Sequence, residues 1–314
     1  MTALSIHLFP VDVGDYGVVH VRVVAPAADL DPDMTGFRPF AGPPRTIPVV
    51  VLLNGAGCPP ERLHWLGVRL ATAGFAAVSY GLLQRIGPTV TWSPGVDIAA
   101  SAPTSDGTTP PCPVLVPLFA ALAVDDRCTA LDLTSPIAFG HSAGGSVALL
   151  SAGRVGLEHL RNVVAYGTHL VASTTSGRAA GSIMATKAVS TLIIGGGRDG
   201  VVQKAIDDGR YGENASKENL LTRSIAEGCV DADWAAAVQL PSAGHFACTE
   251  GYDGIGSSGH LEPAAADVDP ADRAAIGDLV VSFCLAMRSE GFPAPDRLDA
   301  PRVNTLAQVL RPKD

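Results

Sequence analysis

The stretch Gly-His-Ser-Ala-Gly at 140–144 places a serine at its centre and glycines at both ends, a pattern that suits a nucleophilic serine. An apolar run at 135–139 precedes it and small residues at 145–150 follow it, an order that predicts a strand, a sharp turn and a helix. Side chains at the two outer positions would clash inside such a turn, so glycine is expected there. The turn would lift the hydroxyl of Ser142 clear of the sheet edge, where it could act as a nucleophile. His141 is expected to shape the turn rather than to transfer protons.

A serine hydroxyl needs a base to take its proton, and the base needs an acid to orient it. In a parallel sheet these partners are expected on loops at the carboxyl ends of later strands. Asp199 follows the apolar run at 190–194, and His245 follows the run at 234–240. Taken alone, Asp199 could simply cap a helix and His245 could be an ordinary turn residue. Together, in the order serine, acid, histidine, they predict a catalytic triad with Ser142.

An oxyanion that forms during attack by a serine needs two N–H donors held in place beforehand. The amide of Ala143, directly after the serine, is expected to be one of them. The loop at 53–58 leaves the first buried parallel strand, and Ala56 in this loop is expected to supply the second. Glycines in such a loop could instead bind a nucleotide, but neither the dinucleotide-binding nor the P-loop spacing is present.

Along the rest of the chain, patterns typical of strands alternate with patterns typical of helices. Two early runs, at 4–9 and 18–24, flank a Gly-Asp-Tyr-Gly turn and predict an antiparallel hairpin. Continuous apolar runs typical of strands buried on both faces of a parallel sheet follow, with helical patterns between them. The predicted strands are 47–53, 75–80, 135–139, 162–166, 190–194 and 234–240, and the predicted helices include 60–73, 114–123 and 271–289.

The predicted fold class is therefore α/β, a mostly parallel central sheet with an N-terminal antiparallel hairpin and helices on both faces. We expect a single domain over 1–290 and a C-terminal tail over 291–314 that contains one short helical piece. Stretches rich in Pro and Gly predict a loop at 26–46 and a long irregular segment at 84–112. Residues 200–233 carry helical patterns between two of the strands.

Charge and hydropathy limit the partners of this chain. Its 314 residues carry a net charge of −9 without a basic cluster, which argues against nucleic acid or an anionic membrane surface. No apolar run reaches about 18 residues, so no integral membrane association is expected. Residues 1–10 lack the pattern of a signal peptide, which predicts a cytoplasmic location.

The six cysteines lack the paired spacing of zinc ligands, so no bound metal is expected. Buried, reduced thiols are the simplest state for a chain with this expected location. A disulfide between Cys229 and Cys248 stays open as an alternative, because both residues lie near the strand at 234–240.

Four motifs, at 52–57, 140–144, 196–202 and 244–245, resemble the landmarks of serine hydrolases with the α/β-hydrolase fold, and they span most of the chain. The glycine loop and the absence of a large lid before the serine are similar to the branch of dienelactone hydrolases, chlorophyllases and polyester hydrolases. The resemblance implies a serine esterase that cleaves a small-molecule carboxylic ester through an acyl-enzyme intermediate, without a cofactor. An acyltransferase or C–C bond hydrolase would use the same triad, and a binding protein on this fold would normally have lost part of it.

The chain departs from this family at Asn54, where a histidine usually stands, and in the long segment 84–112. That segment and 200–233 are candidates for a cap or lid over the site. A homodimer stays open as the assembly.

Other residues have weaker claims to the site. His260 is the one rival to His245 as the base, and no strand is predicted directly before it. Trp92, Met184 and Phe246 could line an apolar pocket for the substrate, but the role expected of each is in packing or in anchoring a loop.

Overall fold

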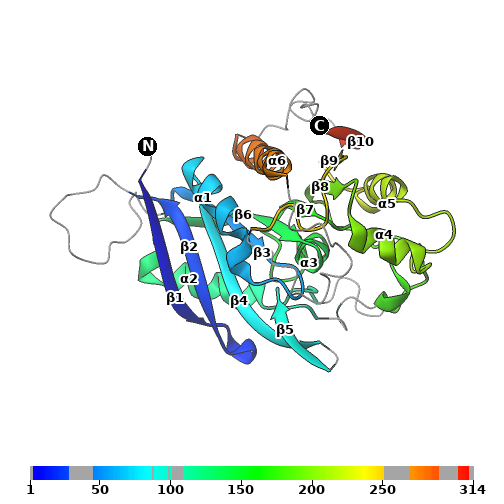
Figure 1. The fold of residues 1–314 in the computed structure, drawn as a ribbon. Helices are drawn as coiled ribbons and strands as arrows, with labels where there is room; N and C mark the ends of the chain where they lie inside the picture. The colour runs from blue at the N-terminus through cyan, green and yellow to red at the C-terminus, as the bar shows by residue number, and fades with distance from the viewer. Residues whose placement is uncertain are drawn as a thin grey trace.

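In the computed structural model, the described residues (3–27, 45–86, 88–97, 100, 109–250, 269–289 and 303–310) build one ten-stranded sheet (Figure 1). The strands are β1 (Leu4–Asp12), β2 (Val18–Pro26), β3 (Ile47–Leu53), β4 (Ala76–Ile86), β5 (Thr89–Ser93), β6 (Leu131–His141), β7 (Asn162–Tyr166), β8 (Ser190–Gly196), β9 (Trp234–Leu240) and β10 (Asn304–Leu310).

The strands follow the order β1-β2-β4-β3-β6-β7-β8-β9-β10, and β5 pairs with β4 alone. All pairings from β4 through β3 and β6 to β9 are parallel. The pairings β1–β2, β2–β4, β4–β5 and β9–β10 are antiparallel. The predicted mostly parallel sheet with an N-terminal antiparallel hairpin is therefore confirmed.

Helices cover both faces of this sheet. The α-helices are α1 (His64–Thr72), α2 (Leu115–Val124), α3 (Ala143–Ser151), α4 (Gly200–Asp207), α5 (Lys217–Arg223) and α6 (Pro270–Arg288). Short helical turns are η1 (Gly14–Tyr16), η2 (Pro60–Leu63), η5 (Asp126–Cys128), η6 (Thr174–Ser176) and the π-helix η7 (Ser224–Gly228).

Strand β3 shows why the apolar runs are continuous. Val49 and Val51 belong to the buried cluster that also holds the apolar residues of α2 and α3. Val50 and Leu52 point to the other face, into the cluster formed with α1 and α6. Because successive side chains of a strand alternate between faces, a strand covered on both sides must be apolar at every position. The predicted arrangement of helices on both faces is confirmed by these two clusters.

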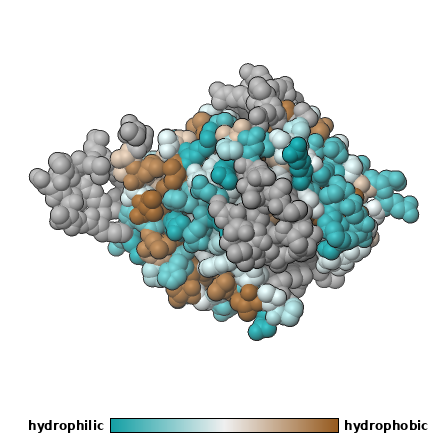
Figure 2. Space-filling view, in the orientation of Figure 1, coloured by the Kyte–Doolittle hydropathy of each residue, from teal (hydrophilic) through white to brown (hydrophobic). Residues whose placement is uncertain are grey.

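In the N-terminal hairpin, only one face of the strands is covered, so buried and exposed side chains alternate. In β1, His7, Phe9 and Val11 are buried, whereas Ile6 and Leu8 between them are exposed. Figure 2 shows apolar side chains gathered on this side of the molecule, over β1 and β2 and toward β5. One face of the hairpin therefore belongs to the core and the other carries exposed side chains, many of them apolar.

Two segments differ from their predicted structure. Within 84–112, β4 continues to Ile86 and turns back into β5, with Leu83 opposite Trp92. The β-branched and aromatic residues of β5 form this ladder despite the neighbouring prolines and glycines. In the tail, residues 304–310 form β10 instead of a short helix, because the open edge of β9 offers hydrogen bonds to an extended segment. Residues 28–44 of the predicted loop lie outside the described residues.

All six cysteines are buried as free thiols. The alternative of a disulfide between Cys229 and Cys248 is therefore wrong. Both thiols are almost fully enclosed, and burial raises the pKa of Cys229 to about 11.

The packing of α6 on the sheet gives a stability prediction. The ring of Phe283 lies 5.7 Å from that of Trp234, centroid to centroid, and both side chains are fully buried. Replacing Phe283 by Ala should lower the free energy of unfolding by about 3–5 kcal/mol, because it leaves a cavity. Urea unfolding measures this loss. Leu285→Ala in the same helix, at a side chain that is 39% exposed, should cost far less, and equal losses would contradict this account.

Candidate active site

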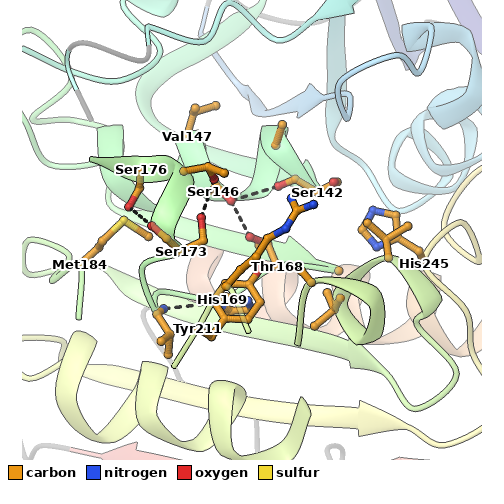
Figure 3. A pocket seen from close by; sticks show the side chains of 18 of the residues that line it. Ser142, Ser146, Val147, Thr168, His169, Ser173, Ser176, Met184, Tyr211 and His245 are labelled. Carbon is orange, nitrogen blue, oxygen red and sulfur yellow. Dashed lines mark hydrogen bonds between the residues drawn. The ribbon is translucent and has the colours of Figure 1, made fainter. Parts of the chain in front are cut away.

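The predicted site residues meet at one edge of the sheet. Strands β6 to β9 are parallel, so their carboxyl ends lie together. Ser142 directly follows β6, Asp199 follows β8 by a short turn, and His245 follows β9 in the same way. Ser142 and His245 line one pocket at its same end (Figure 3).

The serine turn is strained and closely packed. Ser142 has φ 54° and ψ −119°, a region that side chains rarely adopt, and its N–H donates to the carbonyl of Tyr166 over 2.8 Å. A Cβ at position 140 would lie 2.4 Å from the carbonyl oxygen of Gly144. A Cβ at position 144 would lie 2.4 Å from the carbonyl oxygen of Leu53. Backbone atoms stand where side chains would go, so this turn requires both glycines.

His245 and Asp199 form a buried pair. Nδ1 of His245 donates to Oδ2 of Asp199 over 2.8 Å, and the two residues are 3% and 2% exposed. The other carboxylate oxygen, Oδ1, accepts the N–H of Val202 over 2.8 Å at the start of α4. Asp199 thus serves both as a helix cap and as the partner of a histidine, the two uses that the sequence left as alternatives.

This pair sets a charged carboxylate against Nδ1 of the imidazole. Burial alone would raise the pKa of Asp199, but the imidazole of His245 and the hydrogen bonds from it and from Val202 outweigh burial and hold that pKa below its usual value. A carboxylate can only accept, so the proton of the neutral imidazole sits on Nδ1. The lone pair of Nε2 is then available to take a proton from a hydroxyl.

The loop after β3 lies against the serine. A Cβ at Gly55 would stand 3.2 Å from Cβ of Ser142. Among the described residues, the N–H groups of Ala56 and Ala143 meet no hydrogen-bond acceptor. The role of these two amides as oxyanion donors stays a prediction.

Asn54, the departure from the family pattern, holds this loop in shape. Its side chain is buried, and Nδ2 donates to the carbonyl oxygens of Gly55 over 3.1 Å and of Cys58 over 2.7 Å. The amide side chain therefore ties the two ends of the loop together. The N–H of Gly57 in this loop donates to the carbonyl oxygen of Trp92 on β5 over 2.9 Å.

The pocket beside the serine has a volume of about 520 Å³ and an apolar wall with polar groups set into it. Of the three residues considered for this lining, Met184 lies in it, whereas Trp92 and Phe246 do not. Trp92 packs against Gly81, and Phe246 against the rings of His141 and His245, which agrees with the packing role expected of them. The apolar lining residues are Val96, Val147, Leu150, Val171, Met184, Val201, Val202 and Ala205. Segments 84–112 and 200–233 therefore both contribute to the pocket.

Polar residues that the sequence did not indicate also reach this pocket. Ser146 and Thr168 share a hydrogen bond of 2.5 Å, and Arg210 and Tyr211 follow α4 at the rim. His169 is buried, and its Nδ1 accepts the N–H of Val171 over 3.2 Å. Ser146 lies on α3, Thr168 and His169 follow β7, and Arg210 and Tyr211 follow α4. None of them belongs to a motif, so only the fold brings them to the site.

Two histidines near the pair are unsuited to act as bases. Burial, and next the neighbouring His245, lower the pKa of His141 to about 3. Burial likewise lowers the pKa of His169 to about 4. His260, the rival to His245 in the sequence, lies outside the described residues.

Two further properties concern metals and membranes. The described part of the chain brings together no group of three His, Cys, Asp or Glu side chains that could hold a metal ion. No helix in that part combines the length and the apolar character that crossing a bilayer requires.

No protein-family model and no curated protein matches the sequence. The structure is similar to a ferulic acid esterase from Streptomyces cinnamoneus, over 97% of this chain and 96% of that one, with 15% identity and a TM-score of 0.57. It is also similar to a dienelactone hydrolase from Anabaena variabilis, over 90% of this chain and 97% of that one, with 17% identity and a TM-score of 0.50. The chain has the α/β-hydrolase fold.

The α/β-hydrolase fold confirms the fold implied by the four sequence motifs. At this level of identity the similarity concerns the backbone, so the chemistry must be argued from the side chains of this chain.

The contacts of the serine turn give a first prediction for this site. Gly144→Ala should lower the free energy of unfolding by about 1–3 kcal/mol, because its methyl group meets backbone oxygens that cannot move independently. Thermal or urea unfolding measures the loss. Gly67→Ala in α1 is the matched control, since its Cβ would meet Cβ of Ala77 at an ordinary 3.4 Å. If the two variants are equally stable, the turn does not need its glycine.

The lowered pKa of His169 gives a second prediction. The unfolded chain takes up this proton near pH 6.5 and the folded chain only near pH 4, so stability is full above pH 6.5 and falls as the pH decreases toward 4. At pH 5 this residue should cost about 2 kcal/mol of stability.

His169→Asn keeps an acceptor for Val171 but cannot titrate in this range. The difference in unfolding free energy between pH 7 and pH 5, measured in urea, should therefore shrink by about 2 kcal/mol. His20→Asn, at an exposed position on β2, should leave that difference unchanged. An unaltered difference in His169→Asn would show that the residue titrates freely.

Proposed function

We propose that this chain is a serine hydrolase that cleaves carboxylic esters. One observation carries the proposal: a buried Asp199–His245 pair opens onto the same pocket as a serine held on a strained turn. Strain in a backbone persists only where the surrounding structure enforces it, and such sites are often functional. The similarity of the backbone to an esterase and to a dienelactone hydrolase supports the proposal.

In the first step, Nε2 of His245 takes the proton of Ser142 as Oγ attacks the carbonyl carbon of the ester. The electron pair of the C=O bond moves onto oxygen, which the amides of Ala56 and Ala143 stabilise. Collapse of this intermediate expels the alcohol oxygen, which receives the proton from His245. A water molecule then attacks the acyl-enzyme with help from the same imidazole and releases the acid. Asp199 stabilises the imidazolium in both steps.

The pocket supports substrates of small to medium size. A volume of about 520 Å³ with an apolar wall suits an acyl or alcohol group of several carbon atoms rather than a polymer buried whole. The hydroxyl groups of Ser146, Thr168 and Tyr211 add hydrogen-bonding capacity within it. A substrate with both apolar and oxygen-bearing parts fits this lining best.

The proposal predicts that Ser142→Ala eliminates hydrolysis of p-nitrophenyl esters and labelling by a fluorophosphonate probe. A loss of about 10³-fold or more is expected, because the nucleophile is gone while the fold remains. Esters of increasing acyl length, assayed with the wild type, define the chain length that the pocket accepts. Ser135→Ala, on the exposed part of β6, is the matched control and should label normally. Normal labelling of Ser142→Ala would end the proposal.

Asp199→Asn separates the two uses of that carboxylate. Its amide oxygen can still cap α4 at Val202, but the imidazole loses its charged partner. Turnover should fall by about 10³- to 10⁴-fold with little change in stability.

Added alcohols distinguish an acyltransferase from a hydrolase, because an acyltransferase would form a new ester as its main product.

A further inference from the structure

The loop that carries His245 is held by side chains from two other strands. We call residues 241–249, directly after β9, the base loop. Oη of Tyr166 donates to the carbonyl oxygen of Gly244 over 2.5 Å. Nε2 of His141 lies 3.0 Å from the carbonyl oxygen of His245 itself. Side chains at the ends of β6 and β7 therefore bind two successive carbonyl groups of the base loop.

The two residues that make these bonds form a pair. His141 ends β6, Tyr166 ends β7, and the two stand opposite each other in the parallel ladder. Side chains at paired positions project to the same face of a sheet, and their ring centroids are 6.2 Å apart. Both are almost fully buried, at 1% and 0% exposure.

The same two residues are joined to the serine through their backbone. His141 directly precedes Ser142, and the carbonyl of Tyr166 accepts the N–H of Ser142 over 2.8 Å. Each therefore touches the serine turn with its main chain and the base loop with its side chain. His141 links Ser142 to the base loop through the peptide bond and one hydrogen bond, and Tyr166 does so through two hydrogen bonds.

His141 also meets the loop of the proposed oxyanion donors. A carbonyl oxygen only accepts, so the neutral ring carries its proton on Nε2 and leaves Nδ1 bare. A Cβ at Gly55 would stand 2.9 Å from that Nδ1, which shows how closely the loop approaches the ring. The ring centroid lies 5.0 Å from that of His245, so a neutral His141 does not repel the imidazolium that forms there during turnover.

We propose that His141 and Tyr166 are positioning residues, whose two hydrogen bonds to the base loop set the separation between the hydroxyl of Ser142 and the imidazole of His245. This inference rests on the proposed function. The Asp199–His245 bond orients the ring, whereas the two carbonyl contacts fix the backbone from which the ring extends. Without them, the imidazole could move with its loop away from the serine, and a displacement of about 1 Å can cost about 10²-fold in rate.

Tyr166→Phe is the sharpest test, because it removes one oxygen and keeps the ring. The carbonyl of Gly244 still receives the N–H of Ala247 over 3.3 Å, so it is not left unsatisfied. We expect kcat for p-nitrophenyl ester hydrolysis to fall by about 10- to 100-fold while KM changes less than about threefold. Tyr80→Phe is the matched control: this side chain is as buried as that of Tyr166, and its hydroxyl donates to the carbonyl oxygen of Pro94 over 2.5 Å, away from the base loop. It should lower the melting temperature by a similar amount and keep kcat.

His141 is tested by rescue. His141→Gln can place an amide N–H near the position of Nε2, whereas His141→Leu cannot donate a hydrogen bond. The Gln variant should retain most of kcat, and the Leu variant should lose about as much as Tyr166→Phe. If the two variants lose kcat equally while their melting temperatures match, the contact with the base loop is not what His141 contributes.

Amide hydrogen exchange gives a readout that needs no activity. Exchange in residues 243–249 should quicken in Tyr166→Phe and stay at the wild-type rate in Tyr80→Phe. Unchanged exchange together with unchanged kcat in Tyr166→Phe would overturn the inference. A wild type that neither hydrolyses esters nor labels with a fluorophosphonate would overturn the proposed function, and with it the catalytic part of this inference. The exchange measurement would still decide whether the two bonds hold the loop.

Discussion

The site depends on one buried carboxylate that binds on two sides. Oδ1 of Asp199 accepts the N–H of Val202 in the first turn of α4, and Oδ2 accepts the N–H of the His245 imidazole. A charge enclosed to this degree is costly unless hydrogen bonds compensate for it. Asp199 accepts one on each oxygen, and its carboxylate consequently stays ionised where the proposed reaction needs a negative charge.

At the serine turn, the backbone leaves no room for side chains at two positions. Main-chain oxygens occupy the space beside Gly140 and Gly144, so the chain crosses β3 at a separation that only glycine permits. This close crossing brings the loop after β3 to the serine, and the side chain of Asn54 fixes that loop from within. The parallel sheet supplies the remaining geometry, because its strands deliver Ser142, Asp199 and His245 to one edge.

The sequence predicted those parts of the fold that have a local signature. The apolar run of β3 and the glycines around Ser142 each carry a pattern that follows from burial or from steric limits. The strand β10 carried no such signal, because it exists only where the edge of β9 is open to it. Strand β5 was hidden among prolines and glycines that normally indicate loops.

The contacts of the site were less predictable than its participants. Ser142, Asp199 and His245 could be named from motif and order, but their hydrogen bonds could not. The hydrogen bond from Tyr166 to Gly244 joins residues 78 positions apart, and no pattern in the sequence around either residue predicts it. Only the register of β6 against β7 places His141 and Tyr166 beside the same loop.

The two walls of the pocket differ in how well their residues tolerate substitution. One wall belongs to the strand ends, where backbone crowding and buried hydrogen bonds leave little freedom. The facing wall includes α4, none of whose residues is fully buried. Side chains such as Val201 and Ala205 can therefore be exchanged without disturbing the core. A lineage, or a protein engineer, can thus reshape what this cavity accepts by varying one peripheral helix while the reactive edge stays constant.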